Sequence, residues 1–131
     1  MNQIDPDHID VTSTAKEVGL GFDSLGAPVA VTKGVWLKCV EWTEADSERQ
    51  DYQEQESRLW DVLFTCGGTL QLKLTDFFKA GRHGFTVQCI PRDGKTTAAT
   101  TAHLVARPLP LAQSTWLVID FDSPNTRIRI T

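Results

Sequence analysis

The sequence has few of the residues that hold small secreted or metal-binding domains together. Only three of its 131 residues are cysteine, an odd number, and Cys39, Cys66 and Cys89 are widely separated. A secreted disulfide framework needs paired cysteines, and a zinc knuckle needs two cysteines in a CxxC spacing. Neither is expected, and the three thiols are predicted to be reduced and buried.

Long apolar runs are also missing. No window approaches the roughly 18 apolar residues that a membrane-spanning helix needs. The first residues, MNQIDPDHID, are acidic and lack the apolar run of a signal peptide. These absences predict a cytoplasmic protein with no membrane partner. The length and the 40% of hydrophobic residues predict a single domain, residues 1–131.

Charge is present but unevenly placed. Residues 1–61 carry 13 acids and 5 bases, a net charge of −8, whereas residues 62–131 carry 4 acids and 8 bases, a net charge of +4. Binding to nucleic acid needs Lys and Arg for phosphate contacts, so the acidic half is not expected to bind it.

The first half of the chain favours helices. Thr14-x-x-Glu17 has the spacing of a capping box and Gly19 can end a helix, which predicts about two helical turns. Residues 21–28 are rich in turn-forming residues and predict a loop. Thr32 can cap a second helix, because an apolar stripe follows it. This stripe consists of Val35, Trp36, Cys39 and Val40.

A long third helix is predicted over residues 44–66. Thr43-x-x-Asp46 resembles a second capping box, and Gly67-Gly68 can end the helix. Residues 44–58 are mostly polar and are expected in solvent, whereas the apolar run that follows is expected in the core. The residues predicted to be in the core are Trp36, Cys39, Trp60, Leu63 and Phe64.

The second half of the chain favours strands. Alternation of apolar and polar residues predicts them, and Asp93-Gly94 predicts a hairpin turn. Residues 70–80 fit either a helix or a strand. The fold class is therefore α+β, with N-terminal helices packed on a C-terminal antiparallel sheet of three to four strands. The expected strands are residues 85–89, 103–107, 116–121 and, at an edge, 127–130.

Two sets of residues could carry chemistry. Asp120 and Asp122 point to one side of a predicted strand, and paired carboxylates can bind a divalent cation or divide acid and base roles. Cys89 and His103, with Asp120, could form a nucleophile set, because a thiolate needs a nearby base. A small hydrolase or nuclease is thus one alternative function. No spacing predicts a metal or a cofactor.

A second alternative is nucleic-acid binding by the basic half, which requires its cationic residues to gather on one face. Those residues are Lys73, Lys79, Arg82, Arg92, Lys95, Arg107, Arg127 and Arg129.

The densest feature is EWTEADSERQDYQEQESRLWD, residues 41–61, with eight acids against Arg49 and Arg58. Two interpretations stay open: a solvated helix with local ion pairs, or an acidic docking surface with aromatic anchors. The residues expected to contact a partner are Trp42, Glu44, Glu48, Asp51, Tyr52 and Glu54.

Residues 28–63, PVAVTKGVWLKCVEWTEADSERQDYQEQESRLWDVL, resemble an uncharacterised family of small bacterial proteins encoded on plasmids, phages and integrative elements. The specific part is the pattern VWxxCVEWTEADSxRQxYQ followed by RLWDVL. The resemblance implies a genetic context, the accessory genes of mobile DNA. It brings no established activity and no catalytic residues.

The expected function is a non-enzymatic protein-interaction accessory protein of a mobile genetic element. Its partner is expected to be a protein, and a host complex that binds nucleic acid is a specific form of this expectation. An inhibitor of a host defence complex is the narrowest form, because carboxylates presented to a basic groove can imitate nucleic acid.

Overall fold

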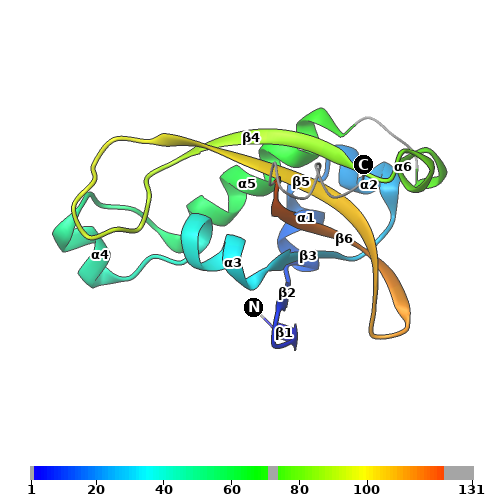
Figure 1. The fold of residues 1–131 in the computed structure, drawn as a ribbon, viewed down its shortest axis with the longest axis horizontal. Helices are drawn as coiled ribbons and strands as arrows, with labels where there is room; N and C mark the ends of the chain where they lie inside the picture. Colours follow the sequence, from blue (N-terminus) through cyan, green and yellow to red (C-terminus); the bar gives the residue numbers. More distant parts are fainter. Residues whose placement is uncertain (1, 71–73, 123–131) are drawn as a thin grey trace, which may run out of the picture.

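Helices and a six-stranded sheet make up the computed structural model, which describes residues 2–70 and 74–122 (Figure 1). The strands are β1 (Asn2–Asp5), β2 (His8–Asp10), β3 (Val29–Thr32), β4 (His83–Cys89), β5 (Thr100–Leu111) and β6 (Ser114–Phe121). The helices are α1 (Thr12–Val18), α2 (Gly21–Leu25), α3 (Lys33–Val35), the π-helix η1 (Trp36–Val40), α4 (Glu44–Arg49), α5 (Gln55–Thr69) and α6 (Leu74–Ala80).

The sheet has the strand order β1-β2-β3-β6-β5-β4. Neighbouring strands are antiparallel except β3 and β6, which are parallel, with Val29 opposite Leu117. The α+β class is confirmed, but the expected antiparallel sheet of three to four strands is wrong, because the sheet is mixed and has six. The strands that were missed are three or four residues long, too short to show an alternating pattern.

The two faces of the sheet differ. One face packs against the helices, where Val31, Leu104 and Ile119 join buried residues of α1, α2, η1 and α5 in the main core. The opposite face carries a small apolar cluster made by strands, centred on Ala30 and Val118. Functional side chains on β4, β5 and β6 can therefore be assigned to the helical face or the opposite face from the strand register.

The short N-terminal helices differ from the expected pattern. Helix α1 begins at Thr12, so Thr14 is buried within the helix and the proposed capping box is wrong. Gly19 ends α1 as predicted, with a φ of 71°. The expected loop over residues 21–28 contains α2, because Phe22 and Leu25, three residues apart, both enter the core.

The prediction of one long helix over residues 44–66 is wrong. Two helices, α4 and α5, occupy this stretch, with residues 50–54 between them. The capping box is confirmed: the Thr43 hydroxyl accepts the Asp46 N–H at 3.2 Å, and the Asp46 carboxylate accepts the Thr43 N–H at 2.8 Å. Thr32 also caps the next helix as predicted, accepting the Val35 N–H at 3.3 Å.

The face of α5 that enters the core was predicted wrongly. Trp60 is 38% exposed and Phe64 is 54% exposed, whereas Leu63 is buried as expected. Cys39 is buried, and Trp36 is partly buried against the core. The run Leu59 to Phe64 is almost continuously apolar, so its periodicity does not define an inner face.

The C-terminal strands were predicted correctly at residues 85–89, 103–107 and 116–121, each within a longer strand. Helix α6 shows that most of residues 70–80 is helical; residues 71–73 and the proposed strand at 127–130 lie outside the described residues. Asp93 and Gly94 lie in the longer connection over residues 90–99 and not in a tight hairpin. Within the described ranges, no helix is both long enough and apolar enough to cross a membrane.

Replacing Gly21 with alanine tests the contact between α2 and the end of α5. A Cβ atom at Gly21 would lie 2.0 Å from the Leu70 carbonyl oxygen, which is backbone and cannot rotate away. We expect Gly21→Ala to reduce the free energy of unfolding by at least about 2 kcal/mol, because overpacking shifts the backbone. Urea unfolding measures this loss.

Gly34→Ala is the matched control. A Cβ atom there would lie 3.6 Å from the Phe121 ring, which is ordinary contact. This substitution should leave stability unchanged or raise it by up to about 1 kcal/mol. Equal effects of the two substitutions would show that α2 does not approach α5 this closely.

Candidate functional site

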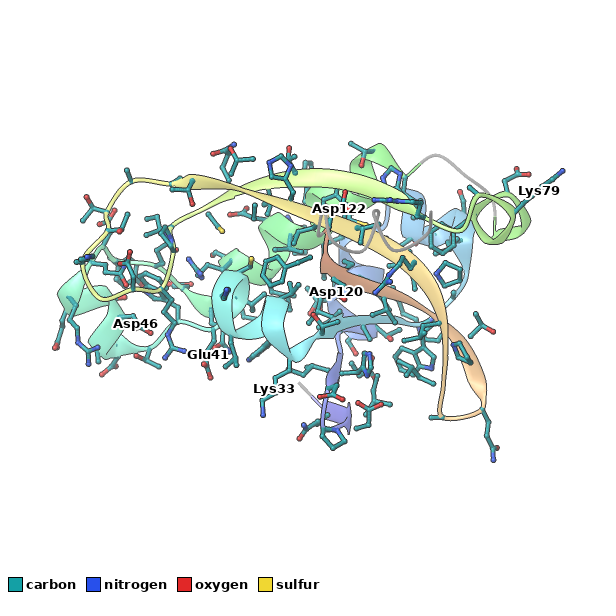
Figure 2. The ribbon with its side chains drawn as sticks, viewed as in Figure 1. Lys33, Glu41, Asp46, Lys79, Asp120 and Asp122 are labelled. Atoms are coloured by element: carbon teal, nitrogen blue, oxygen red, sulfur yellow. The ribbon has the colours of Figure 1, made fainter. Side chains whose placement is uncertain are left out.

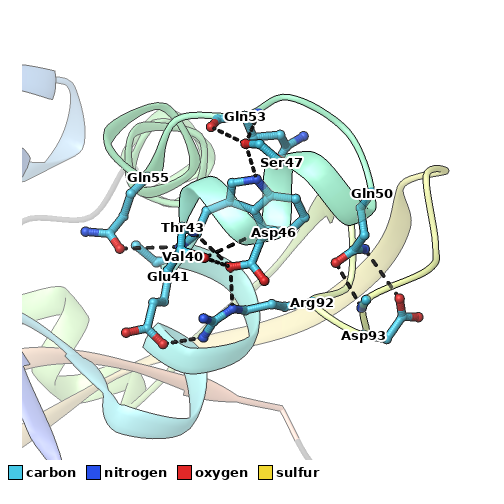
Figure 3. Close-up of polar contacts among 12 residues, drawn as sticks. Val40, Glu41, Thr43, Asp46, Ser47, Gln50, Gln53, Gln55, Arg92 and Asp93 are labelled. Atoms are coloured by element: carbon cyan, nitrogen blue, oxygen red, sulfur yellow. Dashed lines mark hydrogen bonds and ion pairs between the residues drawn. The ribbon is translucent and has the colours of Figure 1, made fainter.

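Part of the acidic segment, residues 41–61, forms a network of polar side chains with Arg92 and Asp93 (Figure 3). Trp42 is 6% exposed, and its indole N–H donates to the Ser47 hydroxyl at 3.0 Å. Its backbone N–H donates to the Gln55 side chain at 3.3 Å. Trp42 is thus a core residue, and its predicted role as a surface anchor is wrong.

Arg58 is buried behind Trp42. Its guanidinium carbon lies 4.4 Å from the centre of the Trp42 ring, a cation–π contact. Its hydrogen bonds, 2.7 to 3.1 Å long, go to the carbonyl oxygens of Lys38, Val40 and Ile90 and to the side-chain oxygen of Gln53. One side chain thereby joins η1, α5 and the residue after β4.

Arg92 joins the start of α4 to the β4–β5 connection. Its Nε donates to Asp46 Oδ2 at 2.8 Å, and its Nη1 donates to Glu41 (Figure 3). Burial alone would raise the pKa of Asp46, but hydrogen bonds from Thr43 and Arg92 outweigh burial and lower this pKa below its usual value. Asp46 therefore belongs to a structural ion pair and does not contribute to an exposed acidic surface.

Gln50 holds the same connection from the end of α4. Its side-chain nitrogen donates to the carbonyl oxygens of Pro91 and Thr96 at 2.7 and 2.6 Å, and its side-chain oxygen accepts the Gly94 N–H at 3.0 Å. Gln50, Asp46 and Arg58 thus form a scaffold that holds residues 90–99, with Arg92 as the partner of Asp46.

The other residues expected to contact a partner lie at the surface. Glu44 and Glu48 are exposed on α4, and Asp51, Tyr52 and Glu54 are exposed in the segment that follows. Tyr52 is 73% exposed, and its hydroxyl donates to Glu54 at 2.7 Å. These five residues are available to a partner, although no continuous helix carries them.

An exposed stripe on α5 was missed in the sequence. Glu56, Trp60, Phe64 and Gly68 recur at every fourth position and are all exposed. Leu20, 47% exposed, lies beside this stripe, since its Cδ1 would be 3.9 Å from a Cβ atom at Gly68. The four-residue spacing was the available signal, but it was hidden within the apolar run.

A hollow of about 400 Å³ lies at the start of α5, between Ser57, Arg58 and Asp61 of the helix and residues 52–54. Exposed carboxylates of Glu54 and Asp61 line it together with Tyr52. We call Leu20, Tyr52, Glu54, Glu56, Trp60, Asp61 and Phe64 the α5 surface. It combines large apolar side chains with acids.

Cys39 and Cys89 form a pair of thiols between η1 and the end of β4. Cys39 is buried and Cys89 is partly exposed, while Cys66 is buried elsewhere, in α5. The hydrogen bond from Cys39 lowers the pKa of Cys89 to about 7 against an opposing effect of burial, and the Arg58 charge lowers it further. The same hydrogen bond raises the pKa of Cys39.

The structure separates the proposed nucleophile set. His103 is opposite Thr86 in the β4–β5 register, so its side chain belongs to the sheet face opposite that of Val87 and Cys89. Asp120 shares the face of His103, because it pairs with Val105. His103 and Cys89 line one cavity of about 480 Å³, but the register turns the imidazole to the other face of the sheet from the thiol.

Asp120 and Asp122 lie near the middle of the sheet (Figure 2), and each forms an ion pair with an arginine. Asp120 accepts the Thr32 hydroxyl at 3.2 Å and Arg107 Nη2 at 3.0 Å. Asp122 pairs with Arg82 at 2.8 Å. These contacts are those of structural ion pairs. In the described parts of the chain, no group of three His, Cys, Asp or Glu residues is placed to hold a metal ion.

The described basic residues are dispersed. Lys79 on α6 lies at one end of the molecule and Arg92 at the other, beside Asp46 (Figure 2). Arg82 and Arg107 pair with aspartates near the middle of the sheet. Lys95 is exposed in the β4–β5 connection, and Lys73, Arg127 and Arg129 lie outside the described residues. The described cations do not form one basic face.

No protein-family model matches the chain, and no curated protein or solved structure matches it. The resemblance of residues 28–63 to proteins of mobile elements therefore stays a prediction.

Replacing Arg58 with alanine tests the scaffold. The substitution leaves the carbonyl oxygens of Lys38, Val40 and Ile90 without their guanidinium donor and opens a void behind Trp42. We expect the free energy of unfolding to fall by about 3–5 kcal/mol. Arg49→Ala, an exposed arginine of α4, is the control and should change it by less than about 0.5 kcal/mol. A loss below about 1 kcal/mol for Arg58→Ala would contradict the scaffold.

Proposed function

We propose that this chain is a non-enzymatic protein-interaction protein that binds a basic protein partner through the α5 surface. The observation that carries the proposal is the exposure of Trp60 and Phe64, one helical turn apart, on a helix whose opposite side is buried. An aromatic side chain can bury 150–250 Å² in a contact, so the exposed parts of Trp60 and Phe64 forgo some of this hydrophobic gain. Binding to a partner recovers that gain.

Charge indicates the chemistry of the partner. Exposed acids are frequent in residues 41–61, on α4, on α5 and between the two helices: Glu44, Glu48, Asp51, Glu54, Glu56 and Asp61. Interfaces are commonly complementary in potential, and aromatic residues are enriched among those that dominate binding energy. A partner with apolar pockets surrounded by Lys and Arg fits this surface best.

The identity of the partner forms the narrower part of the proposal. Basic surfaces with grooves are typical of proteins that bind nucleic acid, because phosphates require Lys and Arg. We propose that the chain acts as an accessory protein of a mobile genetic element in the bacterial cytoplasm. The chain would bind a host complex that itself binds nucleic acid. In the narrowest form of the proposal this is a defence complex, and the chain inhibits it. The acids of the α5 surface and the resemblance of residues 28–63 support this proposal.

Replacing Trp60 and Phe64 with alanine tests the aromatic part. Proteins captured from a bacterial lysate by the wild-type chain are identified, and the affinity of the purified partner is measured. We expect the double variant to bind at least about 30-fold more weakly, the loss typical of a hot spot. Trp60 is 38% exposed and Phe64 54%, so the double variant also loses the stability of their buried parts, and affinity is measured under conditions in which urea unfolding shows both chains to be folded.

Leu37→Ala is the matched control, since Leu37 is also apolar and exposed but lies on η1. It should bind like the wild type. Unchanged affinity of the double variant would exclude the α5 surface as the contact.

Reversing Glu48, Asp51 and Glu54 to lysine tests the charge. If the acids steer association, the partner should bind with a slower on-rate, and added salt should slow the wild type in the same way. Stability should change by roughly 0–1 kcal/mol, because these side chains are exposed. Surface plasmon resonance at two salt concentrations measures the rates.

The control reverses Asp7, Glu17 and Asp76, exposed acids outside residues 41–61, and so produces the same change in net charge. A similar on-rate for both triple variants would mean that net charge alone attracts the partner. An unchanged on-rate for the Glu48, Asp51 and Glu54 variant would contradict electrostatic steering.

A further inference from the structure

We propose that Cys39 and Cys89 are a redox modification site that closes into an intramolecular disulfide on reaction with a hydroperoxide. Two thiols 50 positions apart in the sequence come together between η1 and β4, where both residues line the same two cavities. Cys39 belongs to the core, and Cys89 packs against it. This modification is independent of the α5 surface and of any partner.

Space for an oxidant is present beside the pair. Two cavities, of about 250 and 480 Å³, are each lined by both Cys39 and Cys89. Either volume exceeds the roughly 30 Å³ that a water molecule occupies in the liquid, so a peroxide of similar size can reach the sulfur. Cys89 is only partly buried, which leaves its sulfur as the accessible member of the pair.

The surroundings favour Cys89 as the attacking thiolate. Cys39 donates its S–H to Cys89, and the nearby Arg58 charge further stabilises the thiolate, so its pKa lies near 7. The charged and titratable residues that line the two cavities are Lys38, Arg58, Asp61, Arg92, Asp93 and His103. Cys66 differs, because burial in α5 raises the pKa of its thiol to about 12.

The backbone of the second thiol is held in place. Cys39 lies between Lys38 and Val40, and Arg58 binds the carbonyl oxygens of both. Closing a disulfide requires the two sulfur atoms to approach to about 2 Å. The two cavities that both residues line leave room for this movement.

The reaction balances in two steps. The Cys89 thiolate attacks one oxygen of hydrogen peroxide, so that an S–O bond forms and the O–O bond breaks. The leaving hydroxide takes a proton from the solvent or buffer and becomes water. The sulfur is oxidised to sulfenic acid and the peroxide is reduced. Cys39 then attacks this sulfur, the S–S bond forms, the S–O bond breaks, and the hydroxyl leaves as water with the Cys39 proton.

The test uses the full-length wild-type chain, reduced and then treated with hydrogen peroxide. We expect free thiols to fall from three to one, and peptide mass mapping to show the Cys39 peptide linked to the Cys89 peptide. The link should form several-fold faster at about pH 8 than at about pH 6, because the thiolate of Cys89 attacks. Dithiothreitol should restore all three thiols.

Three single substitutions separate the roles. Cys66→Ala should still form the link, whereas Cys89→Ala should keep both remaining thiols. Cys39→Ala should stop at the sulfenic acid of Cys89, which dimedone labels. Three thiols that persist in the wild type, at a peroxide exposure that oxidises free cysteine in the same solution, would overturn the proposal. A link that involves Cys66 or joins two chains would overturn it as well.

Discussion

The buried guanidinium of Arg58 fixes how the middle of the chain meets the sheet. A positive charge removed from water requires several good acceptors, and carbonyl oxygens from η1 and from the residue after β4 supply them. The last carbonyls of a helix carry a partial negative charge and lack partners within the helix. The guanidinium thus gains acceptors and the carbonyl oxygens gain a donor. This one set of hydrogen bonds fixes how α5, η1 and the end of β4 lie relative to one another.

The polar side chains around Arg58 explain a segment that looks like a solvated helix in the sequence. Arg92 and Gln50 tie α4 to the β4–β5 connection, and Asp46 completes the capping box of Thr43 at the start of α4 (Figure 3). Inward-facing acids and amides thus build the scaffold, and only the outward-facing acids remain for a partner. The same stretch serves both purposes because its helices are short and turn different residues outward.

Local signals in the sequence were sufficient where structure is decided locally. The capping box of Thr43 and Asp46 spans three residues, and alternation in β4 places Phe85 and Val87 inward, so both were predicted. The side of α5 that faces the core was not predicted, because Arg58 turns it inward by donating to carbonyl oxygens 18 and 32 positions away in the sequence. The proximity of Cys39 to Cys89 and the exposure of Trp60 also depend on contacts between distant parts of the chain, so they could not be predicted. The exposure of the acids at positions 48 and 51 could be predicted, because their segment is mostly polar.

The parallel pairing of β3 with β6 has a consequence for synthesis of the chain. β3 lies inside the sheet, yet one of its two neighbours is β6, which follows it by more than 80 residues in the sequence, with Val29 opposite Leu117. A growing chain on the ribosome consequently holds an open β3 edge until β6 has left the exit tunnel. Strand edges exposed for long periods recruit other chains, and such distant pairings form slowly. Chaperone binding to nascent chains would protect this edge during translation.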